Sequence, residues 1–353
     1  MILLILSLRL AFVGDIMMGS DWGNLGPPPD SGRFLFSEAK PFLDSADIAI
    51  GNLEGPLTTS SACRKKTVKG KSYAFRMPPW LAFNLRDAGL DVLNTANNHA
   101  NDFGEEGKRQ TIATLDSVGI KHTGFTGDIA YLEAESLIVA IIGFGHSPGC
   151  NDIRDIKGAK ALVAKADSSA DIVLVTFHGG AEGPSALHVM GVTETFYSEN
   201  RGNVLEFAHA CVDAGADLVV GHGPHVPRGM ELYGGRLIAY SLGNFCTWNG
   251  INVSGLGGLA PMLMVEIDSA GNFLTGQIVS FTQQKAHYPQ LDPDGEAFKL
   301  IKSLTEEDFG GGGILFGENG ELMPPISKKP IRVAPRLERH LEKARSVSSE
   351  QEQ

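Results

Sequence analysis

The feature that most constrains this chain is a repeated alternation of short apolar runs with longer segments of helical periodicity. Runs rich in Val, Ile and Leu are typical of strands in a parallel sheet that is covered on both faces. We expect strands at residues 8–13, 48–50, 92–93, 137–142, 172–176, 218–220 and 237–240, and helices at residues 79–88, 105–118, 159–166 and 203–214. The alternation predicts an α/β fold.

The pattern changes after residue 260. Residues 262–267 and 273–281 read as an antiparallel hairpin that turns at residues 269–272 and closes one edge of a sheet. No linker divides residues 1–283, which we interpret as one domain. The periodicity weakens from residue 284, so residues 284–353 are expected to form a partly irregular C-terminal extension that ends in a disordered tail.

The charge balance argues against nucleic acid as a main partner, because 30 Lys and Arg residues against 41 Asp and Glu residues give a net charge of −11. No apolar run reaches the roughly 18 residues of a spanning helix, so no membrane span is expected. The four cysteines form no Cys-x-x-Cys pair, which excludes a zinc ribbon and a disulfide framework. A single bridge between Cys63 and Cys150 stays open.

The apolar N-terminus is short, lacks a basic flank and continues directly into the first expected strand. We interpret residues 1–7 as strand or as a misassigned start, and not as a convincing signal peptide. A start further upstream, with a secretion signal, is the open alternative. The compartment is therefore not fixed by these residues.

Polar side chains follow the expected strands at their carboxyl ends, where α/β folds collect ligands. Asp15 follows the first strand. The other clusters are Gly-Asn-Leu-Glu-Gly at 51–55, Asn-Thr-Ala-Asn-Asn-His-Ala-Asn-Asp at 94–102, Phe-His-Gly-Gly-Ala-Glu at 177–182 and Val-Gly-His-Gly-Pro-His at 220–225. Carboxylate, amide and imidazole donors in this order are what a two-metal site requires, and without thiolates they suit Mn, Fe or Zn.

These ordered motifs, over residues 8–283, resemble the poly-γ-glutamate capsule synthesis (CapA) family within the calcineurin-like metallophosphoesterases. The motifs that carry the resemblance are Gly-Asp-Ile-Met-Met at 14–18, Asn-Leu-Glu at 52–54, Asn-Asn-His-Ala-Asn-Asp at 97–102, His-Gly-Gly-Ala-Glu at 178–182, Gly-His-Gly-Pro-His at 221–225 and Tyr-Ser-Leu-Gly-Asn-Phe at 240–245. The resemblance implies a four-layer α-β-β-α sandwich of metallophosphoesterase type, a site at the strand ends, and a place in the cell envelope.

One or two divalent ions are the cofactors that this reading implies. The candidate metal ligands are Asp15, Asn52, Glu54, Asn98, His178, His222 and His225. Three departures from the superfamily pattern bear on them. Met17 stands where the parent has a histidine, Asn52 stands where the parent has a bridging aspartate, and Gly223 takes the first position of a His-Pro-His found in many relatives.

The remaining candidates each have a structural alternative. His99, Asp102 and Glu182 are expected to act in catalysis, although Asp102 could instead cap the next helix and Glu182 could be a solvated loop residue. Arg228 and Asn244 are the candidate substrate-binding residues, with bracing of the loop at His225 as the alternative for Asn244.

A basic loop separates the second and third strands. Its cations are Arg64, Lys65, Lys66, Lys69, Lys71 and Arg76, with Tyr73 and Phe75 among them. The loop either docks an anionic ligand or is a solvated insertion.

Two functions follow from these observations. The first is a metal-dependent hydrolase that acts on a phosphoester or a related anionic substrate in capsule or poly-γ-glutamate biosynthesis. The second is a non-catalytic component that binds or exports polymer together with other subunits of a synthesis complex. The Met17 and Asn52 departures favour the second, and whether the chain is an enzyme stays open.

Overall fold

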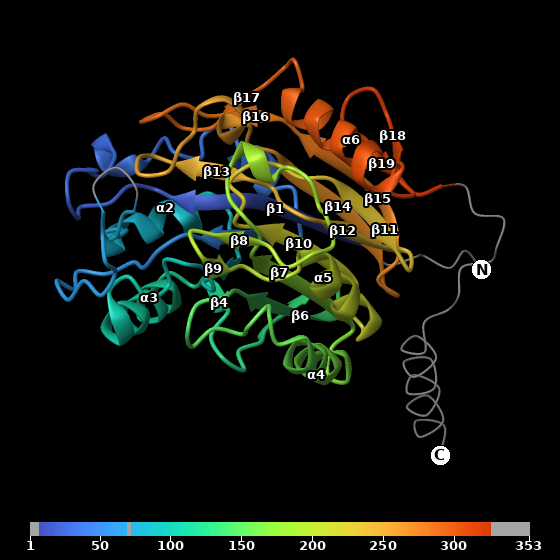
Figure 1. Ribbon diagram of the computed structural model, residues 1–353, viewed down its shortest axis with the longest axis horizontal. Coiled ribbons are helices and arrows are strands. Elements are labelled where there is room, and N and C mark those ends of the chain that lie inside the picture. Colours follow the sequence, from blue (N-terminus) through green and yellow to red (C-terminus); the bar gives the residue numbers. More distant parts are fainter. Residues whose placement is uncertain (1–6, 69–71, 326–353) are drawn as a thin grey trace.

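A computed structural model describes residues 7–68 and 72–325 (Figure 1). In the described part of the chain, its larger sheet contains five parallel strands, β1, β2, β3, β4 and β13, with antiparallel strands added beyond β1. In spatial order the strands are β18 (Leu315–Phe316), β19 (Glu321–Met323), β15 (Phe273–Val279), β14 (Met262–Asp268), β1 (Ser7–Met17), β2 (Ile48–Leu53), β3 (Val92–Asn94) and β4 (Lys121–Thr123), and β13 (Asn244–Thr247) also pairs with β1 in parallel.

The second sheet is built mainly from the later βα passages. Its order is β11 (Met230–Tyr233), β12 (Arg236–Ala239), β10 (Leu218–His222), β7 (Ile172–His178), β6 (Leu137–Phe144) and β5 (Ala130–Ala134). Strands β12, β10, β7 and β6 are parallel, and β11 and β5 flank them as antiparallel edges. Two small hairpins pair β8 (Thr195–Phe196) with β9 (Glu199–Asn200), and β16 (Phe281–Thr282) with β17 (Gln290–Leu291).

The two sheets pack face to face because alternate residues of each strand point to opposite faces. Leu10 and Phe12 of β1 contact the core between the sheets, together with Leu174 of β7 and Val220 of β10. Ala11 and Val13 point to the other face, where they pack beneath helices. One apolar core therefore lies between the sheets, and a further core lies outside each of them.

Helices cover both outer faces. The α-helices are α1 (Lys40–Leu43), α2 (Ala82–Asp87), α3 (Gly104–Ser117), α4 (Ile156–Asp167), α5 (Val204–Asp213) and α6 (Glu296–Phe309), and the short 3₁₀ helices are η1 (Pro29–Gly32), η2 (Pro79–Leu81), η3 (Pro184–Ala186) and η4 (Gly255–Gly258). Helices α1, α2 and α3 contribute to the core outside the larger sheet, and α4 and α5 contribute to the core outside the second. This confirms the expected four-layer α-β-β-α sandwich.

The predicted strands and helices are present, with ends shifted by a few residues. The extension after residue 284 supplies more structure than its weak periodicity indicated, since Phe298 and Ile301 of α6 and Leu322 of β19 reach the core between the sheets. The predicted C-terminal tail from residue 326 and the predicted strand at residues 1–6 lie outside the described residues.

Two remaining sequence predictions can be compared with the structure. The Cys63–Cys150 bridge is wrong: both cysteines are free, with the Cys63 thiol 3.5 Å from the Lys65 carbonyl oxygen and Cys150 packed against Ala96 and Ala100. Within residues 7–68 and 72–325, every helix falls short of the length and hydropathy needed to cross a bilayer.

Candidate functional site

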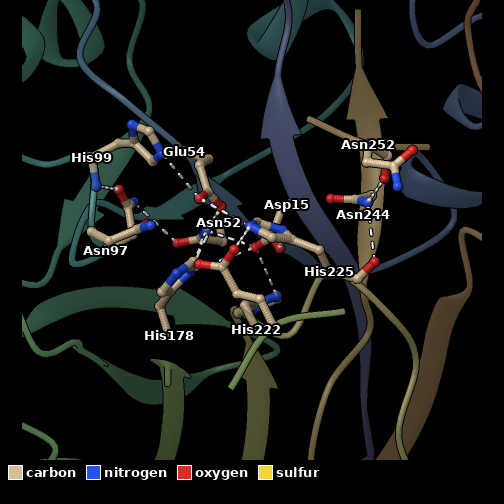
Figure 2. A network of polar contacts seen from close by, with 12 residues as sticks. Asp15, Asn52, Glu54, Asn97, His99, His178, His222, His225, Asn244 and Asn252 are labelled. Atoms are coloured by element: carbon tan, nitrogen blue, oxygen red, sulfur yellow. Dashed lines mark hydrogen bonds and ion pairs between the residues drawn. The ribbon is translucent and has the colours of Figure 1, made fainter. Parts of the chain in front are cut away.

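Strand register places the predicted polar residues side by side at the carboxyl ends of both sheets. In the larger sheet Asp15 lies opposite Asn52 on β2 and opposite Asn244 on β13, and Asn52 lies opposite Asn94 on β3. In the second sheet His222 on β10 lies opposite His178 on β7. Because both sheets end at the same edge of the sandwich, the two rows face each other (Figure 2).

The centre of the site is a buried group of two carboxylates and one imidazole. Donor atoms of Asp15, Glu54 and His225 all lie within 4.8 Å of one another. His225 Nδ1 is 2.9 Å from Asp15 Oδ2, and His225 Nε2 is 3.6 Å from Glu54 Oε1. Asp15 and Glu54 are both 0% exposed. Such close, dry acidic groups require a positive charge between them.

Asn52 holds the acceptors of this centre together as a hydrogen-bond donor. Its Nδ2 donates to Asp15 Oδ1 at 2.8 Å and to Glu54 Oε2 at 3.3 Å, and lies 3.2 Å from His178 Nδ1. Its Oδ1 faces the other way and accepts from the side-chain amides of Asn94 and Asn97. With that orientation Asn52 offers no oxygen to the centre, so its predicted role as a metal ligand is replaced by a positioning role.

Two further histidines line the centre from the second sheet. His178 Nδ1 is 3.8 Å from Asp15 Oδ1 and 3.7 Å from Glu54 Oε2. His222 is held through Nε2 by Thr176 Oγ1 at 3.1 Å, and its Nδ1 lies 4.0 Å from Asp15 Oδ1. That Nδ1 and Glu54 Oε1 are buried without a hydrogen-bond partner among the described residues. Both are acceptor atoms aimed at the same centre.

His225 is placed by an unusual backbone. Its φ is 57°, in the left-handed region that a side chain other than glycine rarely adopts. Asn244 Nδ2 donates to the His225 carbonyl oxygen at 3.1 Å and to the Gly257 carbonyl oxygen at 3.0 Å. Asn244 therefore braces this loop, which was the structural alternative to substrate binding. Strained positions of this kind concentrate at functional sites.

Burial and neighbouring charges raise the pKa values of some groups in the centre and lower those of others. Burial would raise the pKa of Asp15, but hydrogen bonds with His178 and His225 outweigh burial and lower it. Burial and the Asp15 charge raise the pKa of Glu54 well above its usual range. Burial would lower the pKa of His225, but Glu54 and Asp15 raise it to about 10. Burial lowers the pKa of His222 to about 4, so that imidazole is neutral.

His99 lies on the open side of the centre in contact with the basic loop. Its Nδ1 is 2.7 Å from Asp102 Oδ2, and its Nε2 is 3.9 Å from Glu54 Oε1. The Phe75 ring stacks on the imidazole at 3.9 Å between centroids, and the Phe75 N–H donates to Asp102. Lys65 Nζ lies 3.0 Å from His99 Nδ1 and 3.5 Å from Asp102 Oδ1. Burial lowers the pKa of His99 to about 4.

Glu182 reaches the centre from the loop after β7. Its Oε2 is 3.9 Å from His225 Nε2, and its Oε1 is 2.9 Å from the guanidinium of Arg201, a residue that is 3% exposed. Burial would raise the pKa of Glu182, but His225 and Arg201 outweigh burial and lower it. Glu182 is therefore a fixed, ionised carboxylate beside the centre.

Arg228 does not face the centre. It is 0% exposed and makes a bidentate ion pair with Glu194, at 2.9 and 2.7 Å, and it also donates to the Ala181 carbonyl oxygen. Arg228 therefore supports the loop that carries Glu182, whereas the sequence predicted a contact with a substrate. The reason is Glu194, which pairs with the arginine. It lies thirteen residues beyond Ala181 in the sequence, and nothing in the sequence indicated this pairing.

In the motif at 97–102, the Oδ1 of Asn98, a predicted metal ligand, is buried without a hydrogen-bond partner among the described residues. Asn97 contacts Asn52 and donates to the Leu53 carbonyl oxygen at 2.8 Å, whereas the backbone of Asn98 accepts from Lys65. Asn97 and Arg201 are therefore site residues that sequence reasoning did not select, and Lys65 was predicted only as one cation of the basic loop. Asn97 belongs to a motif that was recognised, but nothing in the sequence distinguished it from Asn98.

The residues present fit a divalent cation. Asp15, Glu54, His178, His222 and His225 supply oxygen and imidazole donors, and two of their atoms are orphaned acceptors directed to the centre. Metal ligands must be unprotonated, and burial already keeps His222 neutral. A divalent ion would supply the positive charge that His225 carries otherwise.

Comparison with known proteins gives a consistent family. The model of the family described as "Bacterial capsule synthesis protein PGA_cap" matches residues 9–248. The PGA biosynthesis protein CapA of Bacillus subtilis (strain 168) is 30% identical over 256 residues, which are 67% of this chain and 63% of that protein. The capsule biosynthesis protein CapA of Bacillus anthracis is 28% identical over 259 residues, 67% of this chain and 59% of that protein.

The chain thus spans about three fifths of the length of the curated relatives that it matches. Among solved structures, the calcineurin-like phosphoesterase YfkN from Bacillus subtilis is similar with a TM-score of 0.44 and 12% identity, covering 86% of this chain and 98% of that one.

Proposed function

Since this chain belongs to the bacterial capsule synthesis protein family PGA_cap, we propose that it is a metal-dependent hydrolase of phosphoesterase type acting on an anionic substrate of capsule or poly-γ-glutamate synthesis. The observation that carries the proposal is the buried centre in which Asp15, Glu54 and His225 converge within 4.8 Å. The two carboxylates are shielded from water, and acceptor atoms beside them lack hydrogen-bond partners among the described residues. A structural role alone does not account for this arrangement.

Each residue at the centre has a role in this proposal. Asp15, Glu54, His178, His222 and His225 would hold one or two divalent ions, with Mn, Fe or Zn suited to these donors. A bound divalent ion would supply Lewis-acid polarisation of a phosphoryl oxygen and activation of water. Asn52 keeps Asp15 and Glu54 in place through its two N–H groups.

Proton transfer falls to the groups on the open side. Asp102 fixes the imidazole of His99 through Nδ1, which leaves the unprotonated Nε2 directed to the centre, where it can accept a proton from an attacking water. Lys65 places an ammonium group beside His99, where it offsets the charge of an anionic substrate. Glu182, held by Arg201, is the second group able to exchange a proton there.

The experiment begins with metal content after purification, measured by elemental mass spectrometry. We expect near-stoichiometric metal in the parent protein and its loss in His178→Ala and His225→Ala. The matched control is His287→Ala, because His287 is exposed and far along the chain from the motifs. Equal metal content in all four proteins would contradict the proposed ligand set.

Turnover of bis-p-nitrophenyl phosphate with added Mn²⁺ then tests the reaction. We expect His178→Ala and His225→Ala to lose at least a hundredfold in kcat/KM while His287→Ala retains the parent rate. A metal-loaded parent that hydrolyses neither diesters nor monoesters would contradict hydrolysis but would leave metal binding intact.

Two observations favour a second function, binding of an anionic polymer without hydrolysis, together with other subunits of a synthesis complex. The Asn52 amide stands in the middle of the acceptors where a bridging carboxylate would serve two ions, and Met17 is fully buried and absent from the centre. This function predicts that Lys65→Glu/Lys66→Glu weakens binding of a γ-linked glutamate decamer although no ester is turned over.

A further inference from the structure

A second cavity lies outside the strand-end site, on the helical face of the larger sheet. Its volume is about 550 Å³, and it lies between the turn η1, helix α1 and the η2–α2 segment. The lining residues that matter here are Arg33, Lys40, Trp80, Phe83, Asn84 and Arg86. None of them belongs to the site described above.

The charge of this cavity is opposite to that of the whole chain. Arg33, Lys40 and Arg86 line it against a single carboxylate, Asp87, so the lining carries a net charge of +2 in a chain of net charge −11. Within residues 7–68 and 72–325, Arg33 has no carboxylate within ion-pair distance. Lys40 pairs with Asp44 at 2.9 Å and Arg86 pairs with Asp87 at 2.6 Å, both on the exposed surface, where such pairs can exchange for a ligand carboxylate.

Two aromatic rings stand exposed beside these cations. Trp80 is 39% exposed and Phe83 is 51% exposed, and the Arg86 guanidinium lies 5.3 Å from the centroid of the Phe83 ring. Aromatic faces next to cations suit a ligand that alternates charged groups with apolar or amide segments. A compact polyphosphate would instead require a concentrated cluster of cations.

The rim of the cavity is held in a strained conformation. Asp30, Ser31 and Gly32 follow one another with φ of 50°, 56° and 68°, and two of these residues are not glycine. Asn84, which also lines the cavity, donates from its side chain to the Ser31 carbonyl oxygen at 2.7 Å. A rim fixed before binding lowers the entropy cost of capturing a flexible chain.

The cavity is connected to the strand-end site through the backbone. Leu57, three residues after Glu54, pairs with Met77, and Trp80 follows three residues later. The basic loop that contacts His99 is the segment between these two points. The basic loop and the wall of the cavity at Trp80 are therefore anchored on the same backbone pairing.

We infer that this cavity is a second binding site for an acidic polyamide, in which Arg33, Lys40 and Arg86 contact carboxylates while Trp80 and Phe83 pack against the methylene and amide groups between them. The inference shares its polymer with the proposed function but needs neither metal nor hydrolysis.

The test is binding of a γ-linked glutamate decamer to the full chain, followed by calorimetry and by tryptophan emission. We expect Arg33→Glu/Arg86→Glu to weaken binding at least tenfold, because both side chains are exposed cations of the lining. The matched control is Lys157→Glu/Lys160→Glu on α4, which makes the same charge change on the other helical face. An equal loss in both double variants would overturn the inference.

Tryptophan emission identifies where on the protein the decamer binds. Trp22 lies beside Arg76 of the basic loop, so the measurement is made in a Trp22→Phe background. In that background the decamer should change the emission, equally when His225→Ala is added, and the change should be lost on Trp80→Phe. A response that persists in Trp80→Phe would overturn the inference. So would a response of Trp80 to ATP with no response to the decamer, since it would assign the cavity to a nucleotide.

Discussion

The chemistry of the strand-end site depends on one amide. Asn52 Nδ2 faces Asp15, Glu54 and His178, and its two hydrogens are donated to the two carboxylates. Asn94 and Asn97 fix the opposite end of the side chain, so it cannot turn its oxygen to the centre. We therefore propose that this amide acts as a clamp, meaning a donor that holds Asp15 and Glu54 in place, and not as a metal ligand.

Asn52→Asp should convert the clamp back into a ligand. A third buried carboxylate removes two donated hydrogen bonds and adds repulsion, so we expect a metal-free loss of stability on the order of 3 kcal/mol. The same charge should tighten Mn²⁺ binding about tenfold, or about 1.4 kcal/mol. Urea unfolding with chelator and Mn²⁺ titration measure the two effects.

Asn52→Ala is the matched variant, because it removes the same donors without adding charge. It should lose stability but gain no affinity for Mn²⁺. If Asn52→Asp binds the ion no more tightly than Asn52→Ala, the centre does not hold a cation and the clamp serves another purpose.

Sequence reasoning reached those site residues that directly follow a strand, and it reached them for a physical reason. Asp15 lies two residues before the end of β1, His178 and His222 end their strands, and the ends of parallel strands meet at one edge. The direction in which a side chain points cannot be predicted from its position at a strand end. The outward-facing oxygen of Asn52, the pairing of Arg228 with Glu194 and the contact of Lys65 with His99 all depend on residues that are distant in the sequence.

At the scale of elements, the site requires two strands of different sheets to approach closely. Gly143 on β6 lies so near Asn94 on β3 that a Cβ at this position would stand 2.3 Å from Asn94 Oδ1. Asn94 in turn donates to Asn52 at 3.2 Å. The absence of a side chain at Gly143 thus allows the second sheet to support the amide row of the first. The strands themselves were predicted from apolar runs, but this contact between sheets has no local signature.

Gly143→Ala should therefore disturb the site through Asn94. We expect a loss of about 2 kcal/mol from overpacking and a weaker affinity for Mn²⁺. A double-mutant cycle with Asn94→Ala tests the mechanism, because removal of the amide makes room for the methyl group. In the Asn94→Ala background the cost of Gly143→Ala should fall by at least about 1 kcal/mol. Additive losses would show that the methyl group acts elsewhere.

For the molecule as a whole, the two sheets must keep a fixed relation, since Asp15 and Glu54 come from one sheet and His178 and His222 come from the other. The opposite end of the sandwich supplies one restraint. Arg236 on β12 donates to the carbonyl oxygen of Ala270, in the β14–β15 turn of the larger sheet, at 2.9 Å. It also lies 3.3 Å from Asp217, whose carboxylate accepts from the Val173 N–H at 2.8 Å.

Asp217 makes this restraint dependent on pH. Burial raises its pKa to about 7, and Arg236 opposes that rise without cancelling it. Because the pKa is higher in the folded chain than in the unfolded chain, folding takes up a proton between about pH 4 and pH 7. The contribution of Asp217 to stability is therefore highest below pH 4, falls as the pH rises through this window, and levels off above about pH 7.

Asp217→Asn removes the titrating group, so the stability of the variant relative to the parent should improve steadily from pH 4.5 to pH 7.5. The slope of that difference should approach about 1.4 kcal/mol per pH unit within the window. Urea unfolding at half-unit intervals measures it, and Asp294→Asn, at an exposed carboxyl, should give a flat difference. A flat difference for Asp217→Asn as well would mean that Asp217 stays ionised in the folded chain, paired with Arg236, and that the restraint between the sheets does not vary with pH.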